Sequence, residues 1–168
     1  QTFPADNWGN VYVLNLNLNN LTADIRILYS GDDAGYGQFA GPDYGLRNPD
    51  NLDWSKDGYI YVQEDRSTSP SSLFGGTSGE EASTWRLNPF TGEMTRIAQI
   101  IRSNLPDAQT DASPADIGNW ESSGIVDVTD LFNTAEGYSL FLIDAQAHSV
   151  RDGVISTAGL VEGGQLLF

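Results

Sequence analysis

The sequence predicts an all-β fold made of about three blades of a β-propeller, which together form part of a ring. Short runs that alternate apolar and polar residues recur between turn signals along the 168 residues, as in half-buried strands. A turn-plus-strand pattern also repeats. Aligning Gly9 with Gly58, 49 residues apart, places residues 11–13 on residues 60–62. Mostly-strand repeats of roughly 40–50 residues are typical of propeller blades, although such patterns also recur by chance in all-β domains.

Three blade-like units are expected, at residues 6–45, 46–103 and 118–168. The strands predicted in them cover residues 11–16, 23–29, 59–62, 83–87, 93–101 and 137–144. The Asp57-Gly58 pair and the Asn-Pro-Phe-Thr-Gly run at 88–92 mark tight turns, because proline restricts φ and glycine accepts the positive φ of sharp reversals. One helical turn is expected near residues 129–133.

Three units are too few for a closed propeller, which usually needs four to eight blades. We therefore expect further blades on the same precursor or on another chain. The absence of an initiator methionine and of a signal peptide at residue 1 suits a mature or trimmed product. Long loops rich in Gly, Ser and Asp are expected at residues 30–47, 66–82 and 103–119, where they can cover one mouth of the ring.

Composition limits the partners. The net charge is −15, from 23 acidic and 8 basic residues, which argues against nucleic acid and anionic membrane surfaces as partners and favours cations. No apolar run is long enough to insert into a membrane. The chain has no cysteine, so disulfides and thiolate metal sites are excluded. Together with its high polar content, these features favour a secreted protein, extracellular or periplasmic.

Residues 48–65 contain the first group of candidate metal ligands. Asp50 and Asn51 stand at the start of a predicted strand, and Glu64 and Asp65 stand at its far end. Carboxylate and amide oxygens are the ligands that calcium prefers, and it needs six to eight oxygens. The alternative is an Asx-turn at the first pair and a solvated acidic strand end at the second.

A second group of candidates lies in the last unit. Glu121 precedes a strand and Asp144 follows one, which suggests that neighbouring blades direct equivalent carboxylates toward a common axis. Trp120 is expected to pack in the core. His148, the single histidine, is either a metal ligand or general base, or a hydrogen-bonded residue at a strand end. No motif identifies a catalytic nucleophile.

Four motifs give the chain a resemblance to a known family. They are Asn-Pro-Asp-Asn-Leu at 48–52, Asp-Gly-Tyr-Ile-Tyr-Val-Gln-Glu-Asp at 57–65, Ala-Ser-Thr-Trp-Arg-Leu-Asn-Pro-Phe-Thr-Gly-Glu at 82–93 and Trp-Glu-Ser-Ser-Gly-Ile-Val-Asp-Val at 120–128. From about residue 45 onward the chain resembles the C-terminal part of PhoX-type alkaline phosphatases, especially the calcium-rich secreted forms of bacteria and cyanobacteria.

The resemblance implies a β-propeller with calcium and iron at its axis that cleaves phosphate monoesters. By position, Asp50, Asn51, Glu64 and Asp65 would face the metal centre, together with Glu121 and Asp144. The chain lacks the iron-bridging cysteine of the family, so it is not expected to be active alone. Two alternatives remain open: a non-catalytic extracellular structural or assembly module built on the same blades, and a lactonase-like calcium hydrolase.

Overall fold

A computed structural model describes residues 8–31, 45–66 and 80–168. The all-β prediction is confirmed. The strands are β1 (Asn10–Asn17), β2 (Thr22–Ser30), β3 (Pro49–Trp54), β4 (Ile60–Glu64), β5 (Ser83–Leu87), β6 (Met94–Gln99), β7 (Trp120–Glu121), β8 (Ile125–Asp127), β9 (Phe141–Ala147) and β10 (Gly163–Leu167). A 3₁₀ turn, η1 (Thr129–Leu131), lies where one helical turn was predicted, and a short helix, α3 (Gly153–Thr157), was not predicted.

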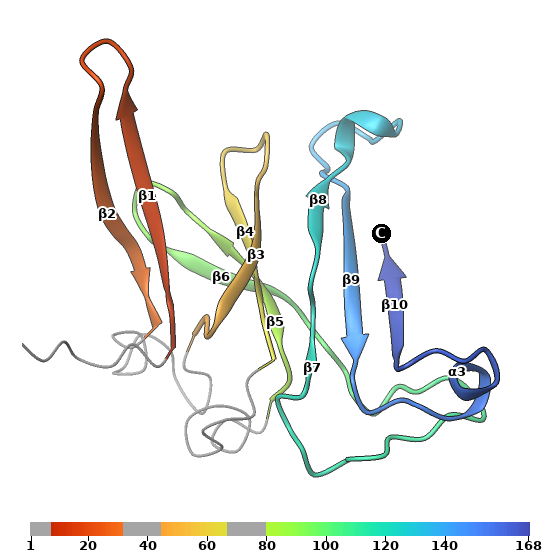
Figure 1. The fold of residues 1–168 in the computed structure, drawn as a ribbon. Helices are drawn as coiled ribbons and strands as arrows, with labels where there is room; N and C mark the ends of the chain where they lie inside the picture. The colour runs from red at the N-terminus through yellow and green to blue at the C-terminus, as the bar shows by residue number, and fades with distance from the viewer. Residues whose placement is uncertain (1–7, 32–44, 67–79) are drawn as a thin grey trace, which may run out of the picture.

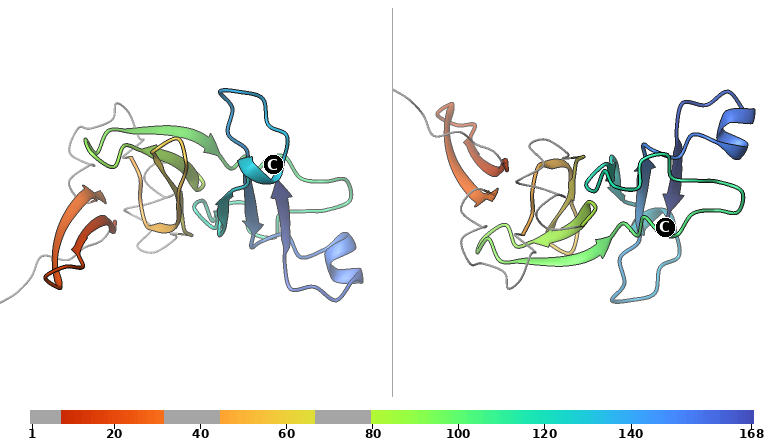
Figure 2. Two further views of the ribbon diagram at one scale, coloured as in Figure 1. Left: turned by 90° about the horizontal axis from the view of Figure 1, so that it is seen from above. Right: turned by 90° about the horizontal axis from the view of Figure 1, so that it is seen from below.

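The strands form three antiparallel sheets (Figure 1). The first sheet is the β1–β2 hairpin, the middle sheet has the order β3-β4-β5-β6, and the third has the order β10-β9-β7 with β8 also paired to β9. The sheets stand side by side in chain order, as the views from above and below also show (Figure 2). Within the described residues they do not close into a ring.

The strands that alternate most clearly were predicted well, and the short or interrupted ones were missed. Strand β5 has the predicted bounds, and β1, β2, β4 and β6 differ from prediction by one to two residues at their ends. Strand β9 begins four residues and ends three residues later than predicted. Strand β3 was missed because its sequence, Pro-Asp-Asn-Leu-Asp-Trp, carries turn-forming residues and has low strand propensity.

A tight turn joins β3 to β4. Ser55 N donates to Tyr59 O at 3.0 Å, and Gly58 N donates to Ser55 O at 3.0 Å. Gly58 has a φ of +87°, which glycine adopts without the steric cost that a side chain would add. The Asp57-Gly58 turn is therefore confirmed, and it reverses the chain so that β3 and β4 run antiparallel.

The first and middle sheets enclose an apolar core. Its buried members are Val11, Tyr29, Leu46, Ile60, Val62, Trp85, Leu87 and Met94. At its edges, Tyr29 Oη donates to Leu46 O at 2.8 Å and Arg26 Nη2 donates to Pro89 O at 2.6 Å. Apart from Leu46, which precedes β3, these members come from the hairpin and from β4, β5 and β6, so the hairpin packs against the middle sheet. Strand β3 contributes nothing to this core.

A polar network joins the middle sheet to the third. Arg102 lies at its centre and contacts Glu81 through Nη1 at 2.8 Å and Asp111 through Nε at 2.5 Å. Glu81 Oε2 accepts hydrogen bonds from Trp120 N at 2.9 Å and from Gly118 N at 3.0 Å. Trp120 is buried, as predicted. Since every buried charge here has a partner of opposite sign, the network fixes the third sheet against the middle one.

Helices contribute little to the described part of the chain. None of the helices there is long and apolar enough to cross a membrane.

Candidate functional site

Asp50 and Asn51 lie at the same end of the middle sheet as Glu64 and Asp65. The prediction placed the two pairs at opposite ends of one strand, which is wrong, because residues 49–54 form a strand of their own. Pro49 in β3 pairs with Glu64 in β4. The antiparallel β3–β4 pair therefore brings residues 50–51 and residues 64–65 to one end of the sheet. Asn51 Nδ2 donates to Asp50 Oδ2 at 2.7 Å on an exposed part of this end.

Glu64 is fully buried and its carboxylate is engaged by the surrounding chain. Oε1 accepts from Arg47 N at 2.9 Å and from Trp85 Nε1 at 3.0 Å, and Oε2 accepts from Ser83 N at 2.8 Å. Burial raises the pKa of Glu64 to about 7, against the lowering by the Arg47 guanidinium and these hydrogen bonds. The side chain ties three segments of the core together, so its oxygens are already committed.

Asp65 and Glu121 meet where the middle and third sheets adjoin. Their carboxyl groups share a hydrogen bond, and Arg66 N donates to Glu121 Oε2 and, at 2.6 Å, to Asp65 Oδ1. Burial, the hydrogen bond to Glu121 and its charge raise the pKa of Asp65 to about 6, and Asp50 adds to the effect. Two acids this close cannot both ionise without cost, so below about pH 6 they hold one proton between them.

His148 lies between two carboxylates. Its Nε2 is 2.8 Å from Glu121 Oε1, and its Nδ1 is 2.8 Å from Glu162 Oε1. Since both ring nitrogens face acceptors, the ring is arranged as an imidazolium that donates to both. Burial lowers the pKa of His148, but the hydrogen bonds to Glu162 and Glu121 outweigh it and the net shift is upward. A metal ligand needs a deprotonated nitrogen, which this arrangement disfavours.

The same cluster holds down the pKa of Glu121. Burial alone would raise this pKa, yet the hydrogen bonds from Asp65, Arg66 N and His148 together lower it. Glu121 is therefore the ionised member of the pair, and Asp65 carries the shared proton below about pH 6.

Asp144 lies near this cluster but does not join it directly. Its Oδ1 accepts a hydrogen bond from Ser123 N at 2.8 Å, and Ser123 Oγ lies 3.5 Å from Glu121 Oε1. Ser123 thus bridges the two acids. Asp144 sits in the middle of β9, paired with Leu166, rather than after the strand as predicted.

The structure therefore brings Asp65 and Glu121 together, with Asp50 close enough to affect the pKa of Asp65. Glu64 belongs to the core, and the side chain of Asn51 donates a hydrogen bond to Asp50. Sequence reasoning did not include Glu162, which lies just before the Gly-Gly that begins β10. An acid next to a strand start was the available signal, and it was too common to single out.

Among residues 8–31, 45–66 and 80–168, no group of three or more His, Asp or Glu side chains has an arrangement that can hold a metal ion. The site is thus the Asp65–Glu121 carboxylate pair, with His148 linking Glu121 to Glu162. In comparisons with protein-family models, curated proteins and solved structures, no match to this chain was found.

Proposed function

We propose that this chain supplies consecutive blades of a secreted, calcium-binding β-propeller phosphatase of the PhoX type. The arrangement of the sheets supports the propeller part of the proposal. Each sheet follows the previous one in chain order, and the middle sheet is a four-stranded antiparallel meander, as a propeller blade is. The long connections from β2 to β3 and from β6 to β7 span residues 31–48 and 100–119. In this proposal, the first hairpin corresponds to the outer half of a blade, which β5 and β6 form in the middle sheet.

An exposed apolar face supports the proposal that further blades adjoin this chain. Cross-strand pairs on one face of the hairpin are Tyr12 with Ile27 and Leu14 with Ile25, and all four side chains are exposed. Contiguous apolar patches of this kind mark interaction surfaces. In this proposal, a neighbouring blade from the same precursor or another chain covers them.

The observation that carries the calcium proposal is the Asp65–Glu121 pair. One carboxylate directly after β4 and one in β7 share a proton below about pH 6, and a divalent cation can replace this proton while balancing both charges. Asp50 affects the pKa of Asp65, and Ser123 links Glu121 to Asp144, so further oxygens for calcium would have to come from backbone carbonyls, water or a movement of these side chains. Glu64 and Asn51 do not fit as ligands here, because their polar groups are committed to protein contacts.

Phosphate ester cleavage is proposed for the complete protein alone. A cation at Asp65 and Glu121 would neutralise the charge of a bound phosphate monoester. Iron would find only carboxylate oxygens in this set, since both nitrogens of His148 face carboxylates.

The proposal is tested by calcium titration of the 168-residue chain in two buffers of different ionisation enthalpy. Calcium should displace a proton near pH 6, and Asp65→Asn should weaken binding at least about tenfold. Asp107→Asn, at an exposed loop position, is the matched control. Absence of binding at millimolar calcium, or equal binding by both variants, would overturn the calcium site. Chelator-sensitive hydrolysis of a chromogenic phosphate monoester by the native material tests the phosphatase separately.

A second candidate function is a non-catalytic extracellular assembly module. It is favoured by the engagement of Glu64 and His148 in protein contacts, which leaves few free groups for chemistry, and by the exposed apolar hairpin face. Ordered polymers without turnover and without bound iron would support this module over the phosphatase.

A further inference from the structure

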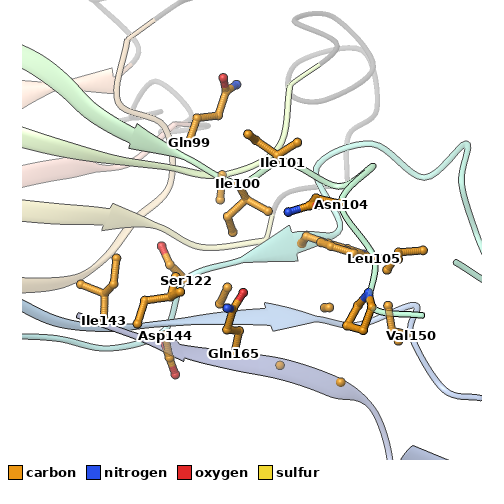
Figure 3. A pocket seen from close by; sticks show the side chains of 18 of the residues that line it. Gln99, Ile100, Ile101, Asn104, Leu105, Ser122, Ile143, Asp144, Val150 and Gln165 are labelled. Carbon is orange, nitrogen blue, oxygen red and sulfur yellow. The ribbon is translucent and has the colours of Figure 1, made fainter. Parts of the chain in front are cut away.

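A cavity of about 610 Å³ lies between the middle and third sheets (Figure 3). Its walls come from β5 and β6, from β9 and β10, and from residues 100–109 of the connection that follows β6. This volume falls within the range of small-molecule sites, which are mostly apolar with a few directed polar groups. It lies on the opposite face of the middle sheet from the packed apolar core.

Small side chains create the space. The cavity walls include Ala82, Ala98, Ala145, Ala147, Gly163 and Gly164. Larger apolar groups, among them Ile100, Leu105 and Val150, complete the lining. Because the two backbones are held in place by the Arg102 network and by sheet hydrogen bonds, the walls do not collapse onto one another. The result is an apolar space instead of a filled core.

One buried hydroxyl group faces this space without a partner. Ser122 is only 4% exposed, lines the cavity, and its Oγ has no hydrogen bond to any described residue. Figure 3 shows Ser122 among the lining side chains, beside Ile143. Buried hydroxyls are normally hydrogen-bonded, so an orphan at a cavity wall indicates a missing partner.

A second orphan lies behind the same wall. Gln63 is fully buried, and both atoms of its amide lack a partner among the described residues. It pairs across the strands with Thr84, which lines the cavity. Cross-strand neighbours point to the same face of a sheet, so Gln63 and Thr84 face the third sheet together.

The lining is nearly free of charge. Asp144 is the one ionisable residue among the lining residues, and strand alternation turns its side chain to the face opposite Ile143 and Ala145. Its carboxylate accepts from Ser123 N. A charged ligand would lose its hydration here without gaining a counter-charge. The lining therefore selects neutral molecules.

We propose that this cavity binds a neutral, mainly apolar small molecule whose single hydroxyl or carbonyl group hydrogen-bonds to Ser122 Oγ. The apolar body lies against the Ala, Ile and Leu side chains, and the polar group completes the hydrogen bonding of the buried hydroxyl. The Ser122 hydroxyl is separate from the Asp65–Glu121 pair, so the test of ligand binding in the cavity does not depend on calcium binding.

Three probes of one shape test the proposal: 4-phenylbutanol, 4-phenylbutyrate and 4-phenylbutylamine. Each is titrated into the ¹⁵N-labelled 168-residue chain and followed by amide chemical shifts. The alcohol should bind with a dissociation constant on the order of 1 mM, as expected for a ligand of this size. Its shifts should centre on Ser122, Ala145 and Gly164, and both charged analogues should bind at least about tenfold more weakly.

Two variants locate the site. Ala145→Leu should fill the cavity and abolish the shifts, whereas Ala135→Leu, at an exposed loop position, should leave them unchanged. Ser122→Ala should weaken the alcohol about fivefold, as for loss of one hydrogen bond, and Ser103→Ala is its exposed control. If Ala145→Leu does not fold, the loss of alcohol affinity in Ser122→Ala tests whether the ligand binds in the cavity.

Three results would overturn the proposal. One is no shift at about 10 mM of the alcohol, well above the expected dissociation constant. Another is equal binding of all three probes. The third is a set of shifts centred on the exposed hairpin face, which would indicate adsorption at that surface.

Discussion

The middle sheet packs against a neighbour on each of its faces, and the two interfaces are built differently. Toward the first sheet, large side chains such as Tyr29, Trp85 and Met94 fill the space. Toward the third sheet, Ala and Gly leave a cavity, and the Arg102 network provides much of the attachment. One face is held by apolar burial and the other by buried charge pairs.

The difference shows that one sheet can serve two purposes. Apolar packing tolerates no empty space without loss of stability, so the first interface is suited to a permanent contact. Directed polar contacts fix the position of a sheet while leaving a space beside it. The second interface therefore combines attachment with room for a ligand, and it also holds the Asp65–Glu121 pair.

Removal of the largest buried side chain of the first interface should have the largest effect. Trp85→Ala is expected to lower the free energy of unfolding by about 3–5 kcal/mol, because it leaves a cavity and removes the donor to Glu64. Urea denaturation measures the change. Phe90→Ala, at a side chain that is 81% exposed, is the control and should change stability by less than about 0.5 kcal/mol. Equal losses in the two variants would contradict a packed core there.

The second interface should respond most strongly to loss of its central charge. Arg102→Leu leaves Glu81 and Asp111 buried without their counter-charge, so a loss of about 3 kcal/mol is expected. Lys56→Leu removes one member of an exposed ion pair with Asp130 and should cost less than about 1 kcal/mol. Similar values for both variants in urea denaturation would show that the network does not attach the third sheet.

Stability should fall as pH rises from about 5 to 8. The folded state raises the pKa of Glu64 from 4.5 to about 7, so it binds this proton more tightly than the unfolded chain does. The stability that the proton adds is lost as pH rises between those values, by about 3 kcal/mol. The raised pKa values of Asp65 and His148 act in the same direction.

Two variants divide this pH effect between the interfaces. Urea denaturation at several pH values should show that Glu64→Gln removes most of the slope, which belongs to the first interface. His148→Gln should remove only the part near neutral pH that belongs to the second. A slope that persists unchanged in Glu64→Gln would contradict this assignment.

The smallest effect is expected outside both interfaces. Leu14→Thr on the exposed face of the hairpin should cost less than about 1 kcal/mol in the isolated chain, because Leu14 is exposed there and is paired across the strands with Ile25. Val11→Thr, at a buried position of the same strand, should cost more. A loss above about 2 kcal/mol for Leu14→Thr would mean that this face is already covered in the isolated chain.

Much of the fold could be predicted because strand formation leaves a local pattern. The runs that became β1, β5 and β6 alternate clearly, and each has Gly or Pro within two residues of one end, so their positions could be predicted. Strands β7 and β8 are very short, and β3 and β10 are rich in Asp, Asn or Gly. These four strands are stabilised by the strands they pair with, and the local sequence does not indicate that pairing.

For the candidate site, the individual residues could be predicted from the sequence, but their grouping could not. Asp65 and Glu121 were both named from the sequence, but grouped with Glu64, which has the same chemistry and lies next to Asp65. Alternation along β4 and its continuation places neighbouring side chains in different surroundings. Glu64 therefore enters the core, while Asp65 meets Glu121 at the edge.

The sequence by itself determined the all-β class, the acidic surface, the absence of thiol chemistry and the places of the main strands, since these depend on composition and on patterns a few residues long. Only the tertiary structure decided that Asp50 lies at the same end of the middle sheet as Asp65, that Glu121 lies between Asp65 and His148, and that the two faces of the middle sheet differ. These contacts join residues far apart in the chain, such as Arg66 and Glu121, 55 positions apart. Sheet register and packing create these long-range contacts, and no short stretch of the sequence specifies either of them.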